Sequence, residues 1–132
     1  MATNNDKTPV IMEWAGDVRG DNLAIKVGQR VFTVDKYGTL ASHRYKRAQV
    51  RPFPSGPLMT TVEGLADLIV GNTYSISQSE IMVGKLLESH LFGYTFLSVN
   101  PEGKVKFMDV EYDQAITHIQ AGNIKILRYP KD

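Results

Sequence analysis

The sequence contains no cysteine among its 132 residues. Disulfide bonds, thiolate zinc sites and cysteine nucleophiles are therefore excluded together. An excess of one charge is also lacking, because 15 basic side chains face 14 acidic ones. No apolar run approaches the roughly 20 residues that a membrane-spanning helix needs, and residues 1–8 contain no hydrophobic stretch of a secretory signal. These absences predict a cytoplasmic protein with no membrane partner.

Motifs for nucleotide binding and for catalysis are missing as well. Neither a phosphate-binding loop, nor a dinucleotide fingerprint, nor a Gly-x-Ser-x-Gly elbow occurs. Asp109, Glu111 and Asp113 form the closest group of carboxylates, and their place just before an expected helix favours a capping role over metal binding. His118 is expected at the boundary of that helix and not at a ligand position. We therefore expect no catalytic residue, no metal and no cofactor, and a protein that is not an enzyme.

The length and composition indicate one folded domain. Apolar residues make up 42% and charged residues 22% of the chain, close to the average of globular proteins. Residues 1–8 are small and polar, so we expect a disordered N-terminus there and a single α+β domain over residues 9–132.

The first half predicts an N-terminal antiparallel β-meander. After a short apolar run at 10–14, apolar and polar residues alternate over 22–27, and β-branched and aromatic residues indicate further strands over 31–34 and 39–47, with glycine-containing turns between them. The proline-rich segment 52–57 interrupts this pattern and predicts a connector.

The second half predicts two helices, a β-hairpin, a short helix and a final strand. Thr60–Glu63 and Ser77–Glu80 have the form of capping boxes, and each precedes apolar residues at helical spacing. The second of these helices would contain Gly84, which we expect only where packing is close, and would bury His90 on its apolar face. A hairpin is expected over 94–110, a helix over 112–119 and a strand over 124–129.

The summed charge hides an asymmetry along the chain. Residues 1–57 carry nine basic and five acidic side chains, whereas residues 58–132 carry six and nine. No acidic residue occurs between positions 36 and 62. Cations interleaved with two aromatic rings occupy this stretch, and they form the predicted anion-binding site: Lys36, His43, Arg44, Tyr45, Lys46, Arg47 and Arg51.

Part of this stretch resembles a known element. Residues 31–42, VFTVDKYGTLAS, are similar to the strand–turn–strand element of small DNA-binding modules appended to HNH homing endonucleases. The resemblance covers only this hairpin, and the histidines of those nucleases have no counterpart in the chain. It therefore illustrates the hairpin and assigns no family.

The basic segment favours a small non-enzymatic binding protein that contacts nucleic acid or another polyanion. Cations neutralise phosphates with release of counterions, and aromatic rings can stack on bases. A solvated edge strand guarded by charge would look the same in sequence. The main alternative is a protein-binding inhibitor or adaptor, of the accessory kind that phages and mobile elements encode. A homo-oligomer and a pocket for a nucleotide ligand are further alternatives. A winged-helix arrangement with a recognition helix over 78–91 is disfavoured by the two glutamates on that helix.

Overall fold

The structure is a computed structural model, and it describes residues 8–14, 23–35, 37–48, 50–52, 58–77 and 80–128. The predicted disordered segment 1–8 therefore lies, apart from Thr8, outside the described residues. Residues 53–57 of the expected connector lie outside them too.

The described residues form mostly β-structure. The elements in chain order are β1 (Val10–Trp14), β2 (Leu23–Val27), β3 (Arg30–Val34), β4 (Leu40–Arg44), β5 (Val50–Pro52), β6 (Leu58–Thr61), the 3-10 helix η1 (Leu65–Asp67), β7 (Thr73–Ser77), β8 (Ile81–His90), β9 (Gly93–Val99), β10 (Val105–Glu111), α1 (Tyr112–Gln120) and β11 (Ile124–Arg128). The nine residues of α1 are too few to cross a bilayer, and no other helix in the described ranges is longer.

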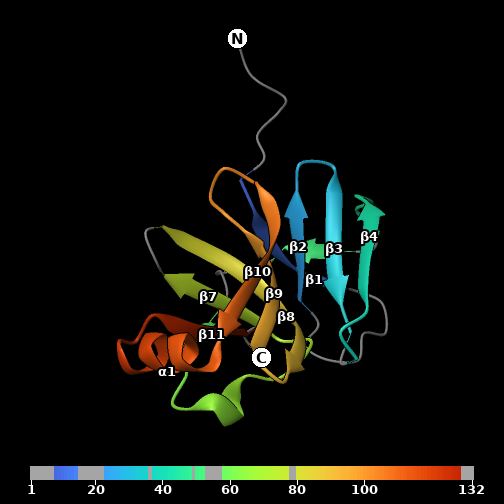
Figure 1. Cartoon of the computed structure of the whole chain (residues 1–132). Coiled ribbons are helices and arrows are strands. Elements are labelled where there is room, and N and C mark those ends of the chain that lie inside the picture. The colour runs from blue at the N-terminus through green and yellow to red at the C-terminus, as the bar shows by residue number, and fades with distance from the viewer. Residues whose placement is uncertain are drawn as a thin grey trace.

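Two antiparallel sheets make up the fold (Figure 1). Sheet A has the strand order β4-β3-β2-β1-β5, and sheet B has the order β10-β9-β8-β7-β11-β6. The β2–β3–β4 meander and the β9–β10 hairpin are formed by neighbours in sequence. By contrast, β11 comes from the end of the chain and pairs with both β6 and β7. These pairings join residues that are far apart in the sequence, so no local pattern could predict them.

The two faces of sheet B are buried by different sets of side chains. Helix α1 covers one face of sheet B, where Ala115 and Ile119 join a core with Tyr74, Ile76 and Phe96. Part of the opposite face packs against sheet A through a second, smaller apolar cluster. That cluster consists of Ile11, Ile25, Val27 and Phe32 of sheet A with Val83, Val99 and Val105 of sheet B. Sheet B is therefore covered by different partners on its two faces.

The α+β class expected from the sequence is wrong, because neither of its two central helices exists. Residues 81–90 form the strand β8, which pairs with β7 and β9. Its centre is buried from both sides, so apolar residues occur at successive positions and not only at alternate ones. A register shift between Leu86 and Glu88 adds a second departure from alternation. Together these features imitate helical spacing.

The first expected helix is also wrong. The segment begins as strand β6 and then forms only the three-residue turn η1, after which Leu68 returns to an extended conformation with φ of −89° and ψ of 97°. Glu63 donates its backbone N–H to a carboxylate oxygen of Asp67 at 3.0 Å instead of completing a box with Thr60. The capping box that does form is at α1, between Glu111 and Gln114.

Candidate nucleic-acid interface

The predicted basic segment lies largely at one edge of sheet A. Strand β4 pairs on one side with β3 and is the last strand of that sheet. Beyond it the backbone N–H of Tyr45 donates to the carbonyl of Gln29 at 2.7 Å, which extends the hairpin by one residue. Arg44, Lys46 and Arg47 are all exposed at this end of the hairpin.

A further arginine belongs to the same surface. Arg30 on β3 is exposed and lies directly opposite Arg44 across the ladder. Its guanidinium donates to the hydroxyl of Ser42, from Nε at 3.0 Å and also from Nη2. The sequence alone does not single out Arg30, because this residue precedes the acid-free stretch and only the β3–β4 register brings it opposite Arg44. We refer to Arg30, Arg44, Lys46 and Arg47 as the basic edge.

The basic edge has no acidic counterpart nearby. Within the described ranges, no carboxylate lies within 4.0 Å of the side-chain nitrogens of its four cations. The Arg30–Arg44 pair places like charges opposite each other, an arrangement that destabilises a sheet unless solvent or an anion screens it. An anion that sits between the two guanidinium groups would remove this repulsion.

The two predicted aromatic residues pack onto the sheet. His43 is half-buried on the face opposite to Arg44, with its ring centroid 4.7 Å from that of Trp14 and its Nε2 3.4 Å from Thr33 Oγ1. Tyr45 is also half-buried, and the Lys26 ammonium lies 4.8 Å from the centre of its ring. Tyr45 and Trp14, against which His43 lies, help to cover the small core around Met12, Ala24, Val31 and Val50. The ring faces of His43 and Tyr45 are thus partly used within the fold, so stacking on a base is restricted.

Arg51 of the predicted set lies on another strand than the basic edge. Arg51 belongs to β5, which is the opposite edge of sheet A from β4, and its side chain lies outside the described residues. Lys36 also lies outside them. The structure therefore places His43, Arg44, Tyr45, Lys46 and Arg47 on β4 and directly after it, and places Arg51 on a different strand of the same sheet.

A second candidate site lies on sheet B, in a pocket of about 380 Å³. Its lining residues come from β8, the β8–β9 turn, β9 and β10, and they are Glu88, His90, Phe92, Thr95, Asp109, Val110 and Glu111. No signal in the sequence joins these residues, because the expected helix over 78–91 placed His90 on a buried helical face. His90 is instead the last residue of β8 and is half-buried at the pocket wall.

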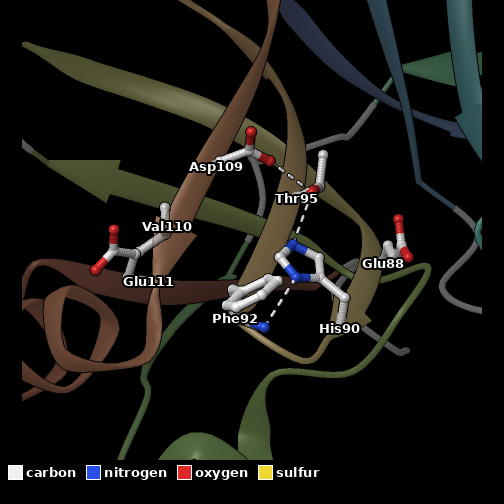
Figure 2. A pocket seen from close by; sticks show the side chains of 7 residues that line it. All are labelled: Glu88, His90, Phe92, Thr95, Asp109, Val110 and Glu111. Carbon is white, nitrogen blue, oxygen red and sulfur yellow. Dashed lines mark hydrogen bonds between the residues drawn. The ribbon is translucent and has the colours of Figure 1, made fainter.

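Hydrogen bonds hold one wall of this pocket in place (Figure 2). The hydroxyl of Thr95 donates to Oδ1 of Asp109 at 2.6 Å, and it lies 3.2 Å from Nε2 of His90. The backbone N–H of Phe92 donates to Nδ1 of His90 at 3.3 Å. Since the Thr95 proton points to Asp109 and Nδ1 accepts, the neutral His90 ring carries its proton on Nε2 and donates it to Thr95.

The three predicted carboxylates have different roles. Asp109 lies on β10 in the pocket wall, Glu111 caps α1, and Asp113 lies in the first turn of that helix. Across the described part of the chain, no group of three histidine or carboxylate side chains is placed to hold a metal ion. His118 is half-buried in the last turn of α1, with Nδ1 3.4 Å from the side-chain nitrogen of Asn123.

The comparisons with known proteins add no assignment. No family model matches the chain, and neither a curated protein nor a solved structure matches it significantly.

Proposed function

We propose that this protein is a non-enzymatic binding protein whose basic edge contacts the phosphates of a nucleic acid. One observation carries the proposal: four exposed cations meet at the end of one hairpin, without a described carboxylate in ion-pair range. The cytoplasmic location expected from the sequence is part of the same proposal.

The like-charged pair at Arg30 and Arg44 supports phosphate as the ligand. Arg30 and Arg44 occupy paired positions on β3 and β4. Two arginines placed in this way can share one phosphate, because each presents a planar pair of N–H donors to its oxygens. The bond from Arg30 to Ser42 orients one guanidinium beforehand. Because Trp14, His43 and Tyr45 are engaged with the sheet, base stacking contributes little. Binding should therefore be weakly dependent on base sequence.

A salt titration with labelled oligonucleotides tests this proposal. Four phosphate contacts give a slope of log K against log salt of about −3.6 on duplex DNA and about −2.8 on a single strand. Raising salt from about 50 to about 200 mM should thus weaken binding roughly 150-fold or roughly 50-fold. Arg44→Ala/Arg47→Ala should bind more weakly and lose about half of that slope.

The matched control is Lys125→Ala/Arg128→Ala, which removes two exposed cations from sheet B and changes the net charge equally. It should bind like the unmodified protein. Equal affinities and equal salt slopes for all three proteins would contradict the proposal, because the basic edge would then contribute nothing to binding. Equal weakening in the two double variants would contradict it as well, because binding would then depend on overall charge and not on the basic edge.

The alternative of a protein-binding adaptor or inhibitor is supported by a different surface. The pocket on sheet B is acidic and has an exposed aromatic ring at its rim, with 73% of Phe92 exposed. Such a surface repels phosphates, so it requires a partner of another kind.

A further inference from the structure

The pocket lies on the part of sheet B that sheet A leaves uncovered. Val83, Val99 and Val105 lie at one end of this face and are packed against sheet A. Side chains alternate between the two faces of a strand, so Thr95 on β9 shares the face of Val99. On β10, Phe107, Asp109 and Glu111 share this face in the same way, and all three are exposed. The face therefore changes from apolar and covered to acidic and open.

Large apolar side chains are exposed at this open end. The two residues of the β8–β9 turn, Leu91 and Phe92, are 83% and 73% exposed, and Phe107 is 66% exposed. The backbone after this turn packs closely on β10: a Cβ at Gly93 would lie 2.1 Å from the carbonyl oxygen of Val110, so this position has room only for glycine. The backbone N–H of Tyr112 also donates to the carbonyl of Phe92 at 3.3 Å. Aromatic rings held in water beside a pocket are typical of a surface that another molecule covers.

The charge of this surface identifies the kind of partner. Glu88, Asp109 and Glu111 line the pocket, and none of the lining residues is a lysine or an arginine. Phosphates of nucleic acids or acidic lipids are therefore repelled, whereas a guanidinium or ammonium group is attracted. Glu111 is partly engaged in capping α1, so Glu88 and Asp109 are the main carboxylates for a cation. An exposed Phe92 ring at the rim can also attract a cation through its face.

The pocket is of a size for one side chain rather than for a large cofactor. Its volume of about 380 Å³ is near the lower limit of ligand pockets, which span roughly 300–1,000 Å³. The hydrogen bonds from Thr95 to Asp109 and between His90 and Thr95 hold the wall before a ligand arrives. A single arginine or lysine side chain can extend into such a pocket while its neighbours contact the rim.

We propose that this acidic–aromatic surface, formed by Glu88, Phe92, Phe107, Asp109 and Glu111, docks a basic peptide segment of another protein. The segment carries an arginine or lysine that enters the pocket and an adjacent apolar residue that packs on Phe92 or Phe107. Charge complementarity and the exposed rings together specify this partner. The proposal does not rest on the nucleic-acid site, which lies on the other sheet and has the opposite charge.

Fluorescence anisotropy with a short labelled peptide of alternating arginine and leucine tests the docking surface. This peptide should bind, whereas peptides with glutamate in place of arginine, or with serine in place of leucine, should bind much more weakly. Glu88→Gln and Phe92→Ser should each weaken binding at least about fivefold, as truncation of an important contact residue does. Both side chains are exposed, so the unfolding temperature should stay unchanged.

Two control variants remove an exposed carboxylate and an exposed apolar side chain elsewhere on the protein. Glu102→Gln changes an exposed carboxylate in the β9–β10 turn, and Ile69→Ser removes an apolar side chain that is 54% exposed. Both should bind the peptide normally.

Unaltered binding by Glu88→Gln and Phe92→Ser, or no binding by any protein, would overturn the proposal. Light scattering that shows a dimer abolished by both variants would assign the surface to a second copy of the chain and overturn the peptide partner. Glu88→Gln and Phe92→Ser should still bind the oligonucleotide, so this experiment can fail or succeed independently of the test of the basic edge.

Discussion

Gly84 provides a direct test of the β8 strand, because strand and helix predict opposite effects of a methyl group there. In the middle of an exposed helix, Gly84→Ala would stabilise the protein by about 0.8–1.0 kcal/mol. In the structure, a Cβ at this position would lie 3.2 Å from Cδ1 of Ile76, 3.4 Å from Cδ1 of Phe96 and 3.6 Å from the carbonyl oxygen of Leu97. Ile76 and Phe96 are each only 1% exposed, so neither can move aside into solvent.

The expected magnitude is the difference between two effects. Overpacking a dense core costs about 1–3 kcal/mol, and the loss of glycine freedom in the unfolded chain returns about 0.4–1 kcal/mol. With the middle of each range, Gly84→Ala should therefore lower the free energy of unfolding by about 1.3 kcal/mol. For a chain of this length, that lowers the unfolding temperature by about 4–6 °C. Calorimetry or urea unfolding followed by circular dichroism measures the change.

A double-mutant cycle with Ile76 tests the stated cause. Ile76→Val removes Cδ1, the atom nearest to the added methyl group, and by itself costs about 0.5–1.5 kcal/mol. In combination, the two substitutions exchange one methyl group for another, so the double variant should be more stable than additivity predicts by at least about 0.5 kcal/mol. Gly64→Ala is the control, because no atom lies within 4 Å of a Cβ there. Stabilisation by Gly84→Ala, or strict additivity with Ile76→Val, would refute the packing argument.

Three further predictions follow from buried or strained positions. Tyr74→Phe should lower the free energy of unfolding, measured in urea, by about 1–3 kcal/mol. The buried hydroxyl donates to one backbone carbonyl near η1 at 2.6 Å and accepts from a backbone N–H at 2.8 Å, and both bonds would be lost. An unchanged urea midpoint would contradict this prediction. Gly38→Ala should lower the unfolding temperature by more than Gly64→Ala changes it. At Gly38, φ is +82° and an added Cβ would lie 1.9 Å from the carbonyl oxygen of Leu87. Equal effects of the two variants would show that Gly38 and Leu87 are not in close contact. Burial and the neighbouring Tyr112 raise the pKa of Tyr94 above its ordinary value of 10.0. The folded state therefore keeps a phenol proton that the unfolded state releases. As a consequence, the free energy of unfolding falls as pH rises above about 10. Tyr94→Phe should show a smaller loss of stability between about pH 9 and pH 11, as measured by urea unfolding at each pH.

Local patterns in the sequence located some elements and misplaced others. Turns with a fixed chemistry were found, such as the one in which Asn100 Oδ1 accepts the backbone N–H groups of Glu102 and Lys104 at 3.0 and 2.8 Å. The expectation of close packing at Gly84 agrees with its surroundings, although it lies in a strand and not in a helix. Capping-box patterns at residues 60–63 and 77–80 were misleading, because a pattern of two side chains does not report whether the following residues pair with distant strands.

The candidate sites also differ in how far local sequence could locate them. The basic segment around Arg44 was visible because a lack of acidic residues is a property of the sequence alone. Its partner Arg30 depended on the register of β3 and β4, and the place of Arg51 on β5, beside β1, depended on the order of strands in sheet A. The pocket around His90 was invisible, since Glu88, Thr95 and Asp109 come together only when β8, β9 and β10 pair.

Residue types and local patterns alone established the absence of thiol chemistry, the division of charge between the two halves, and those turns and caps whose hydrogen bonds close within a few residues. Long-range pairing and packing were needed to show that residues 81–90 are a strand, that β11 lies between β6 and β7, and that one face of sheet B is partly covered by sheet A. The difference lies in the range of the interactions. Turn and cap energies depend on neighbouring residues, whereas burial of a strand on both faces depends on side chains that are far apart in the chain and become neighbours only on folding.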